Sequence, residues 1–130
     1  MSESSKPEIG SINWFDLTIE NAEALRDFYS AVVGWTFSEV EMGGYQDFCM
    51  SLPEDGKTIA GICHARGLNA SLPPQWLVYI TVEDLDQSIT KCKELGGIIL
   101  SGPRDLGSYG RICVIRDPAG AVAALICPPR

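Results

Sequence analysis

The sequence predicts an α+β fold built from two tandem βαβββ modules, which together form one domain. The first observation behind this prediction is that the two halves of the chain align at an offset of 63 to 64 residues, with seven identities over residues 42–63. Chance would give about one or two. The second is that each half shows the same order of hydrophobic periods: one strand, one helix and three further strands.

The first module is expected to span residues 9–63. Residues 12–19 alternate as a strand does, which places two sets of side chains on opposite faces: Phe15, Leu17 and Ile19 on one, and Trp14, Asp16 and Thr18 on the other. Asn21 is expected to cap a helix that ends at Gly34. Its inner face would carry Leu25, Phe28, Tyr29 and Val32. Strands are expected at 36–41, 45–52 and 58–63, with turns at 43–44 and 53–56.

A linker of residues 64–75 leads to the second module, residues 76–127. It opens with a strand at 76–82, and Asp84 is expected to cap the next helix. The inner face of that helix would carry Leu85, Ile89, Cys92 and Leu95, and the helix would stop at 96–97. Strands follow at 98–100, 109–116 and 121–127, and the glycine- and proline-containing segment 101–108 is expected to lack regular structure.

Composition narrows the classes of partner. Ten Lys and Arg stand against seventeen Asp and Glu, a formal charge of −7, and the basic residues are scattered. Nucleic acids and anionic membranes are bound chiefly through basic side chains, so we expect neither as a partner. No apolar run is long enough to cross a bilayer, and residues 1–7 lack the apolar stretch of a signal peptide. We therefore expect a cytoplasmic protein.

Five cysteines form no CxxC pair and no spacing typical of a zinc site, which predicts reduced thiols packed in the core. The offset aligns Cys49 with Cys113 and Cys63 with Cys127, so symmetric redox or metal sites are the alternative. Cys63 and Cys127 are each an odd number of residues from the preceding aligned alanines. By strand alternation we expect both thiols to point toward the helices.

Three segments together resemble a known family. They are residues 24–29 (ALRDFY) leading to the Gly-Trp of 34–35, residues 82–86 (VEDLD) leading to the Gly-Gly of 96–97, and residues 116–120 (RDPAG) before the last strand. On a duplicated βαβββ unit, this combination resembles the vicinal oxygen chelate superfamily, which includes glyoxalase I, bleomycin-resistance proteins and extradiol dioxygenases. The resemblance spans residues 9–126. It implies curled strands that enclose a cup, with the helices outside.

The resemblance also implies a divalent metal held by His and Glu on the first and last strands of the modules. Counting from the turns puts these positions at Trp14, Ala60, Leu77 and Ala124. None of these side chains binds a metal, and an alignment slip could bring in only the single carboxylate of Asp16. We therefore predict neither a metal site nor any other cofactor.

The ligand is expected to bind among inward-facing side chains of the cup: Trp14, Asp16, Thr58, Leu77, Tyr79 and Ala124. Asp16 and Tyr79 occupy equivalent positions and could offer an acceptor and a donor, or could bond to each other or to backbone. Asp16 could also act as an acid or base in a dry cup. Trp14 could form a stacking wall or could fill the cavity.

Other polar residues carry weaker hypotheses. His64, the only histidine, lies just past the last strand of the first module and is expected to be exposed or bonded to backbone, with a ligand or general-base role as the alternative. Tyr45, Tyr109 and Arg111 follow glycine-rich turns. They are expected on a solvated strand edge or at the rim of the cup, where Arg111 could bind an anion.

The function that fits these residues best is a small-molecule-binding protein with a metal-free, largely apolar cup, similar to the bleomycin-resistance branch. One alternative is a metal-dependent lyase or isomerase of the glyoxalase type, with ligands from other positions or from a partner chain. Another is a structural module whose cup is closed. Members of the superfamily commonly pair, so the resemblance also implies a homodimer.

Overall fold

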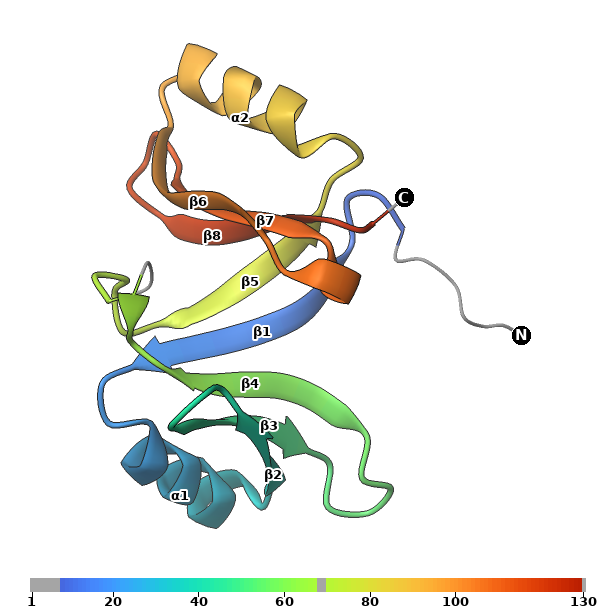
Figure 1. The fold of residues 1–130 in the computed structure, drawn as a ribbon, viewed down its shortest axis with the longest axis vertical. Coiled ribbons are helices and arrows are strands. Elements are labelled where there is room, and N and C mark those ends of the chain that lie inside the picture. The colour runs from blue at the N-terminus through green and yellow to red at the C-terminus, as the bar shows by residue number, and fades with distance from the viewer. Residues whose placement is uncertain (1–7, 68–69, 130) are drawn as a thin grey trace. The chain divides into compact units, whose positions relative to one another are not determined.

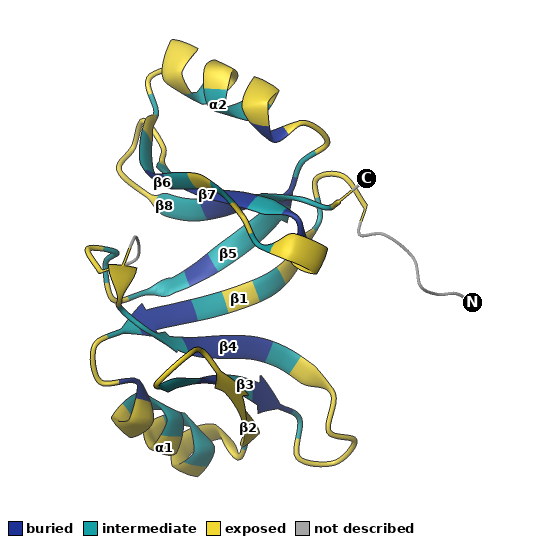
Figure 2. Ribbon diagram, viewed as in Figure 1, coloured by how far each residue is buried: buried dark blue, intermediate teal, exposed yellow. Residues whose placement is uncertain are grey.

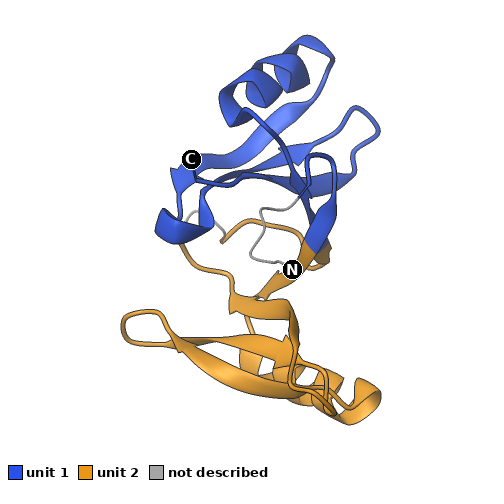
Figure 3. Ribbon diagram, turned by 90° about the vertical axis from the view of Figure 1, so that its right-hand side faces the viewer, with its two compact units in different colours: residues 1–13, 77–130 blue, residues 14–76 orange. Residues whose placement is uncertain are grey.

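A computed structural model describes residues 8–67 and 70–129. The expectation that residues 1–7 hold no signal peptide falls outside these residues. The chain separates into two compact units, one of residues 14–76 and one of residues 1–13 with 77–130 (Figure 3).

The 14–76 unit is a helix packed on a four-stranded sheet (Figure 1). Its elements are β1 (Ile12–Ile19), α1 (Ala22–Val33), β2 (Thr36–Glu41), β3 (Gln46–Ser51) and β4 (Thr58–His64). The strand order is β2-β3-β4-β1. The first and last strands, β1 and β4, pair in parallel, whereas β2 with β3 and β3 with β4 pair antiparallel.

The core of this unit lies between α1 and the sheet. It consists of Leu17, Ala22, Phe48, Met50, Ala60 and Ile62, with Ile19, Leu25 and Tyr29 among the side chains packed against it. The face predicted for Leu17 and Ile19 is thus confirmed, whereas Phe15, predicted on the same face, is 41% exposed and does not join the core. Gly34 ends the helix as predicted, because its φ of 92° suits only a residue without a Cβ. Asn21 precedes the helix but makes no side-chain cap, contrary to expectation.

The apolar surface of α1 is wider than the core it covers. Phe28 and Val32, predicted to face inward, are 53% and 64% exposed, and Val33 is 51% exposed. The Phe28 and Tyr29 rings meet edge to face, with 5.1 Å between their centroids. The neighbouring edge strand β2 is exposed along its whole length (Figure 2). An apolar surface therefore stays open on α1.

The other unit has the same order of elements. They are β5 (Trp76–Thr81), α2 (Leu85–Glu94), β6 (Ile98–Asp105), a short 3₁₀ helix (Gly107–Tyr109), β7 (Arg111–Arg116) and β8 (Val122–Cys127). The strand order is β5-β8-β7-β6, with β5 and β8 again parallel. Leu85, Cys113 and Leu125 form the core under α2, and the Asp84 side chain caps the helix by accepting from the Gln87 N–H, as predicted.

Two expectations for this unit are wrong. Residues 101–105 continue β6 instead of forming an irregular connection. β6 is an edge strand, and its register against β7 shifts twice between Ile99 and Arg104. Such irregular edge positions tolerate a proline that a central strand would not. Leu95 lies past the end of α2 and is 73% exposed, so it does not join the core.

The fold is α+β, as the sequence predicts. Among residues 8–67 and 70–129, neither helix has the length and apolarity needed to cross a bilayer.

Candidate functional site

Strand pairing in the 14–76 unit brings four residues into one row across the sheet. Ser38 on β2 lies opposite Cys49 on β3, Cys49 lies opposite Gly61 on β4, and Gly61 lies opposite Asp16 on β1. Neighbours of these residues along the strands, such as Leu17 and Ile62, point into the core under α1. Because side chains alternate along a strand, the row lies on the sheet face away from the helix.

We call this surface the Asp16 face, defined by Trp14, Asp16, Asp47, Cys49, Gly61 and Cys63. The Asp16 carboxylate is its centre. Its Oδ1 accepts a hydrogen bond from the indole Nε1 of Trp14 at 3.0 Å, and its Oδ2 accepts one from the Cys63 thiol at 3.3 Å. Both bonds are partly buried. An acceptor held from both sides in this way keeps a fixed position.

Gly61 leaves the space that this carboxylate occupies. A Cβ at residue 61 would collide with Oδ1 of Asp16 and would lie 3.3 Å from the Trp14 ring. The glycine is therefore required for the position of the Asp16 side chain above β4, and not for any unusual backbone angle.

The thiols on this face are held neutral. Burial, reinforced by the charge of Asp16, raises the pKa of Cys63 far above its usual range and raises the pKa of Cys49 as well. A thiol in this state is a poor nucleophile and a poor metal ligand, since both roles require the thiolate. Cys63 acts as a hydrogen-bond donor to Asp16, and Asp16 supplies the negative charge between them.

A β-bulge corrects one expected site position. On β4, Ala60 lies opposite Met50 and Thr58 lies opposite Ser51, so Ile59 is an extra residue. Ala60 consequently packs in the core with Leu17, and Gly61 takes the place opposite Asp16. In the other unit, Tyr79 lies opposite Ala124, as Asp16 does opposite Gly61. Equivalent residues of the two units are therefore 63 positions apart in the sequence here, since Asp16 corresponds to Tyr79 and Gly61 to Ala124. The alignment of Ala60 with Ala124 would require an offset of 64.

The same shift separates the aligned cysteines. Cys63 bonds to Asp16 on the face away from α1, whereas Cys127 packs against the core under α2, so only Cys127 points toward a helix as expected. Cys113 is buried in that core, whereas Cys49 lies on the Asp16 face. Paired symmetric redox or metal sites are thus wrong, and so is core packing for Cys49 and Cys63.

The residues present do not fit the divalent metal that the resemblance implies. With the bulge taken into account, the four positions are Trp14, Gly61, Leu77 and Ala124, and none has a side chain that binds a metal. Within the described part of the chain, no group of three or more His, Cys, Asp or Glu side chains is arranged to hold a metal ion.

The six residues predicted to bind a ligand fall into two sets. Trp14, Asp16 and Thr58 belong to the 14–76 unit, and Leu77, Tyr79 and Ala124 belong to the other. Thr58 shares a hydrogen bond of 3.2 Å with the Ser51 hydroxyl. Leu77 and Ala124 are buried, at 1% and 0% exposure. Joint binding by these six residues stays a prediction.

His64 belongs to a polar cluster that the sequence did not reveal. It is the last residue of β4, and its side chain is only 13% exposed. Its Nδ1 lies 3.2 Å from Asp47 Oδ1 and its Nε2 lies 3.1 Å from Glu23 Oε1, while its backbone N–H donates to Asp47 at 2.9 Å. The ring ties α1 to β3 and β4, so the expectation of a linker histidine is wrong.

The residues expected near glycine-rich turns are also placed. Both terminal nitrogens of the Arg111 guanidinium donate to the Asp86 carboxylate at 3.3 Å, so the donors that a bound anion would need are already engaged. Tyr109 is 74% exposed, in the 3₁₀ helix. Tyr45 lies edge-on to His64 and beneath the guanidinium of Arg66, 3.9 Å from the ring centroid.

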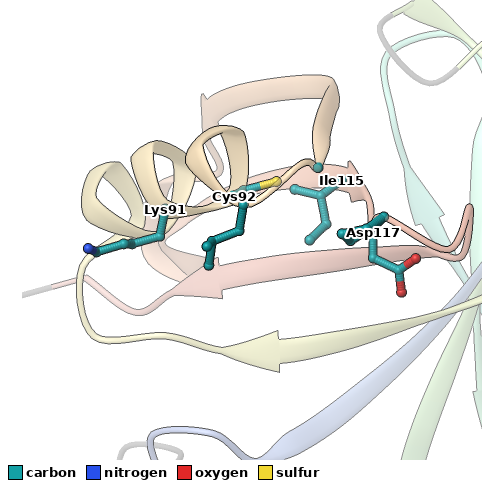
Figure 4. Close-up of a pocket in the computed structure, with 7 residues that line it drawn as sticks. Lys91, Cys92, Ile115 and Asp117 are labelled. Atoms are coloured by element: carbon teal, nitrogen blue, oxygen red, sulfur yellow. The ribbon is translucent and has the colours of Figure 1, made fainter.

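A pocket of about 220 Å³ opens elsewhere, between the end of α2 and β7 (Figure 4). It is lined by Lys91, Cys92, Leu95, Gly97, Ile115, Asp117 and Pro118. Its volume is below the ~300 to 1,000 Å³ typical of small-molecule sites, and none of the predicted ligand-binding residues lines it. The Asp16 face is the better candidate.

Comparison with known proteins identifies the family. The model of the Glyoxalase/Bleomycin resistance protein/Dioxygenase superfamily matches residues 11–125. CFP32 of Mycobacterium bovis, whose name proposes rather than states a glyoxylase activity, is 31% identical over 121 residues. The anthracycline biosynthesis protein DnrV of Streptomyces peucetius is 30% identical over 131 residues.

These alignments cover 93% and 89% of this chain, but the chain spans only 45% and 46% of the two relatives. Among solved structures, a variant of methylmalonyl-CoA epimerase from Streptomyces coelicolor, in complex with 2-nitronate-propionyl-CoA, has a TM-score of 0.59 at 16% identity. The match covers 95% of this chain and the whole of the epimerase chain. At this identity, the likeness concerns the fold alone.

Proposed function

Because the chain belongs to the Glyoxalase/Bleomycin resistance protein/Dioxygenase superfamily, we propose that it binds a small organic molecule at the Asp16 face without a bound metal. The observation that carries this proposal is the carboxylate of Asp16, held between the Trp14 indole and the Cys63 thiol. A fixed acceptor beside an aromatic ring is the combination by which small-molecule sites orient a ligand.

Further side chains extend this surface in the proposal. Thr58 and Ser51 add hydroxyl groups at one end of the 14–76 sheet. Leu77, Tyr79 and Ala124 stay predicted ligand-binding residues, and within their own unit Tyr79 lies opposite Ala124 as Asp16 lies opposite Gly61. The shared order of elements in the two units further supports an origin by duplication.

A metal-dependent lyase or isomerase is the competing function. The 31% identity to a relative named for glyoxylase activity favours it. The four positions at which the resemblance implies metal ligands carry no metal-binding side chain in this chain. Such an enzyme would therefore need metal ligands from other positions or from a partner chain.

We also propose a homodimer that forms through the open surface of α1, with a second copy of this chain as the occupant. Phe28, Val32 and Val33 supply exposed apolar side chains there. The chain spans less than half of the length of each relative. Two copies of this chain together would therefore be about as long as one relative, which supports a second copy as the occupant of this surface. The five free thiols support a reducing, cytoplasmic location.

Two measurements on one sample test the binding function. Protein purified without chelator is analysed for metal and then screened against a fragment library by ¹H–¹⁵N NMR. The proposal predicts substoichiometric metal and saturable shifts of the Trp14 indole and the Gly61 amide that EDTA leaves unchanged. Stoichiometric Zn, Ni, Mn or Fe whose removal abolishes binding would establish the competing function, and ligands that shift only other residues would remove the Asp16 face from the site.

A further inference from the structure

A buried nitrogen of Arg104 lacks an acceptor. Among residues 8–67 and 70–129, the Nε of this arginine is buried and makes no hydrogen bond. The residue as a whole is half-buried and lies on the edge strand β6. Because a guanidinium is always charged, a buried and unpaired donor on it costs free energy, and nearly all such groups in proteins have a partner. An acceptor from outside the chain would remove this cost.

Arg104 lies on the sheet face away from α2. It is opposite Ile112 on the neighbouring strand β7 (Figure 1), and residues directly opposite in an antiparallel pair share a face. The next residue of β7, Cys113, packs in the core under α2, so Ile112 points the other way. On β8 the row continues with Ile126, which is half-buried. The guanidinium therefore belongs to a face whose row of side chains is otherwise aliphatic.

Two register shifts in β6 give this face its polar groups. Ile99 lies opposite Ile115, so an unshifted ladder would put Ser101 opposite Cys113, on the α2 side. The first shift pairs Ser101 with Val114 instead, and the second turns the arginine to the same face. Bulges re-aim side chains in this way and are over-represented next to active sites. The irregularity of β6 thus brings a hydroxyl and a guanidinium to one face.

The acidic side chain closest in sequence does not supply the acceptor. Asp105 follows Arg104 but lies opposite Arg111, and its Oδ1 accepts a hydrogen bond from the Gly107 N–H at 2.7 Å. Residues 77–130 contain six Lys and Arg against six Asp and Glu, so this segment carries no surplus of negative charge. An anionic ligand is therefore not repelled here by the segment that would bind it.

We propose that Arg104 and Ser101 bind the carboxylate of a small organic acid, whose hydrocarbon part extends along the aliphatic row toward Ile126. A carboxylate matches the guanidinium fork and can accept two hydrogen bonds from it. One arginine neutralises one negative charge, which favours a monocarboxylate over a phosphate group with its charge of about −1.5 to −2. The site belongs to the unit that lacks the Asp16 face, so the inference goes beyond the proposed function and does not rest on it.

NMR on the full chain follows the arginine directly. Hexanoate, 1-hexanol and hexyl phosphate are titrated into ¹⁵N-labelled protein, and the Nε–H resonance of Arg104 is assigned by its loss in Arg104→Gln. We expect hexanoate to shift this resonance saturably and to bind about tenfold more tightly than 1-hexanol. Hexyl phosphate should bind no more tightly than hexanoate. The difference between the acid and the alcohol should shrink as ionic strength rises.

Three variants assign the effect. Arg104→Gln removes the charge and should bring hexanoate to the affinity of 1-hexanol. Arg111→Gln is the matched control: it removes a guanidinium that is already paired with Asp86, and it should leave the affinity for hexanoate unchanged. Arg104→Met tests the unpaired atom without a ligand. Because methionine removes the buried donor and keeps an apolar stem, the urea midpoint of this variant should equal or exceed that of the wild type.

Three results would overturn the inference. A hexanoate titration that leaves the Arg104 Nε–H resonance unmoved would show that no acid binds there. Hexyl phosphate that binds about tenfold more tightly than hexanoate would show that the ligand class is wrong. A large fall in the urea midpoint of Arg104→Met would show that the guanidinium is already satisfied in the free protein. Ligand binding at the Asp16 face is followed separately at the Trp14 indole, so the two proposals can fail independently.

Discussion

Asp16 on β1 lies directly opposite Gly61 on β4, and the missing side chain of Gly61 is what gives the Asp16 carboxylate its place above the neighbouring strand. Trp14 and Cys63 then hold the carboxylate from two sides. One strand pair thus determines the position of the only charged group in the row that crosses this sheet.

Replacement of Gly61 by alanine tests this relationship. The new Cβ collides with Asp16, so we expect a loss of about 1 to 3 kcal/mol in the free energy of unfolding, measured by urea denaturation. The backbone at Gly61 needs no positive φ, so alanine brings no conformational penalty of its own. In an Asp16→Ala background the loss should fall by more than half. An equal loss in both backgrounds would contradict the steric account.

Asp16 should also control the neighbouring thiols. Because the charge of Asp16 adds to burial in raising the pKa of Cys49, Asp16→Asn should lower that pKa and speed alkylation of Cys49 by iodoacetamide at alkaline pH. Mass spectrometry of the labelled peptides gives the rate at each site. Cys113 is the internal control, since burial and Cys92 raise its pKa to about 11 without Asp16. Unchanged labelling of Cys49 would show that burial alone acts on it.

Glu23 should make the free energy of unfolding depend on pH in the acid range. Its own backbone N–H and the hydrogen bond from His64 lower its pKa from 4.5, so its carboxylate stabilises the folded state above pH 4.5 and loses this effect as pH falls through the lowered value. Glu23→Gln should therefore unfold at lower urea than the wild type at pH 7, and the difference should vanish in acid. In a His64→Gln background the pH-dependent part should shrink. A difference that persists unchanged in acid would contradict the charge-based explanation.

The open surface of α1 predicts how the chain associates. Val32→Glu places a charge on a side chain that is 64% exposed, so it should convert the proposed dimer to a monomer with little effect on the melting temperature. Light scattering coupled to size exclusion gives the mass. Leu95→Glu is the matched control, because Leu95 is also well exposed, at 73%, but lies in the other unit. A wild-type chain that is monomeric at high concentration would remove the dimer.

Local periodicity predicted most of the secondary structure. Alternation placed β1 and the core side of Leu17, and the glycine at 34 ended α1, because these features depend on neighbouring residues. The bulge at Ile59 was missed, since alternation carries no mark of an extra residue. It moved the site position from Ala60 to Gly61.

The cluster around His64 was missed for a different reason. Glu23 and Asp47 lie 41 and 17 residues from His64 in the chain, and only the packing of α1 on β3 and β4 brings them together. The inward position of Phe28 failed because a helical period gives the direction of a side chain but not the extent of the sheet beneath it. The inward position of Leu95 failed because α2 ends at Glu94, one residue before it.

The most direct test of a metal-free ligand site at the Asp16 face is a crystal structure with the tightest-binding fragment from the NMR screen. The account predicts ligand density against the Trp14 ring, with a donor group within hydrogen-bond distance of the Asp16 carboxylate and no metal ion between ligand and protein. Density confined to the pocket between Lys91 and Pro118, or a metal ion coordinated beside Asp16, would contradict it.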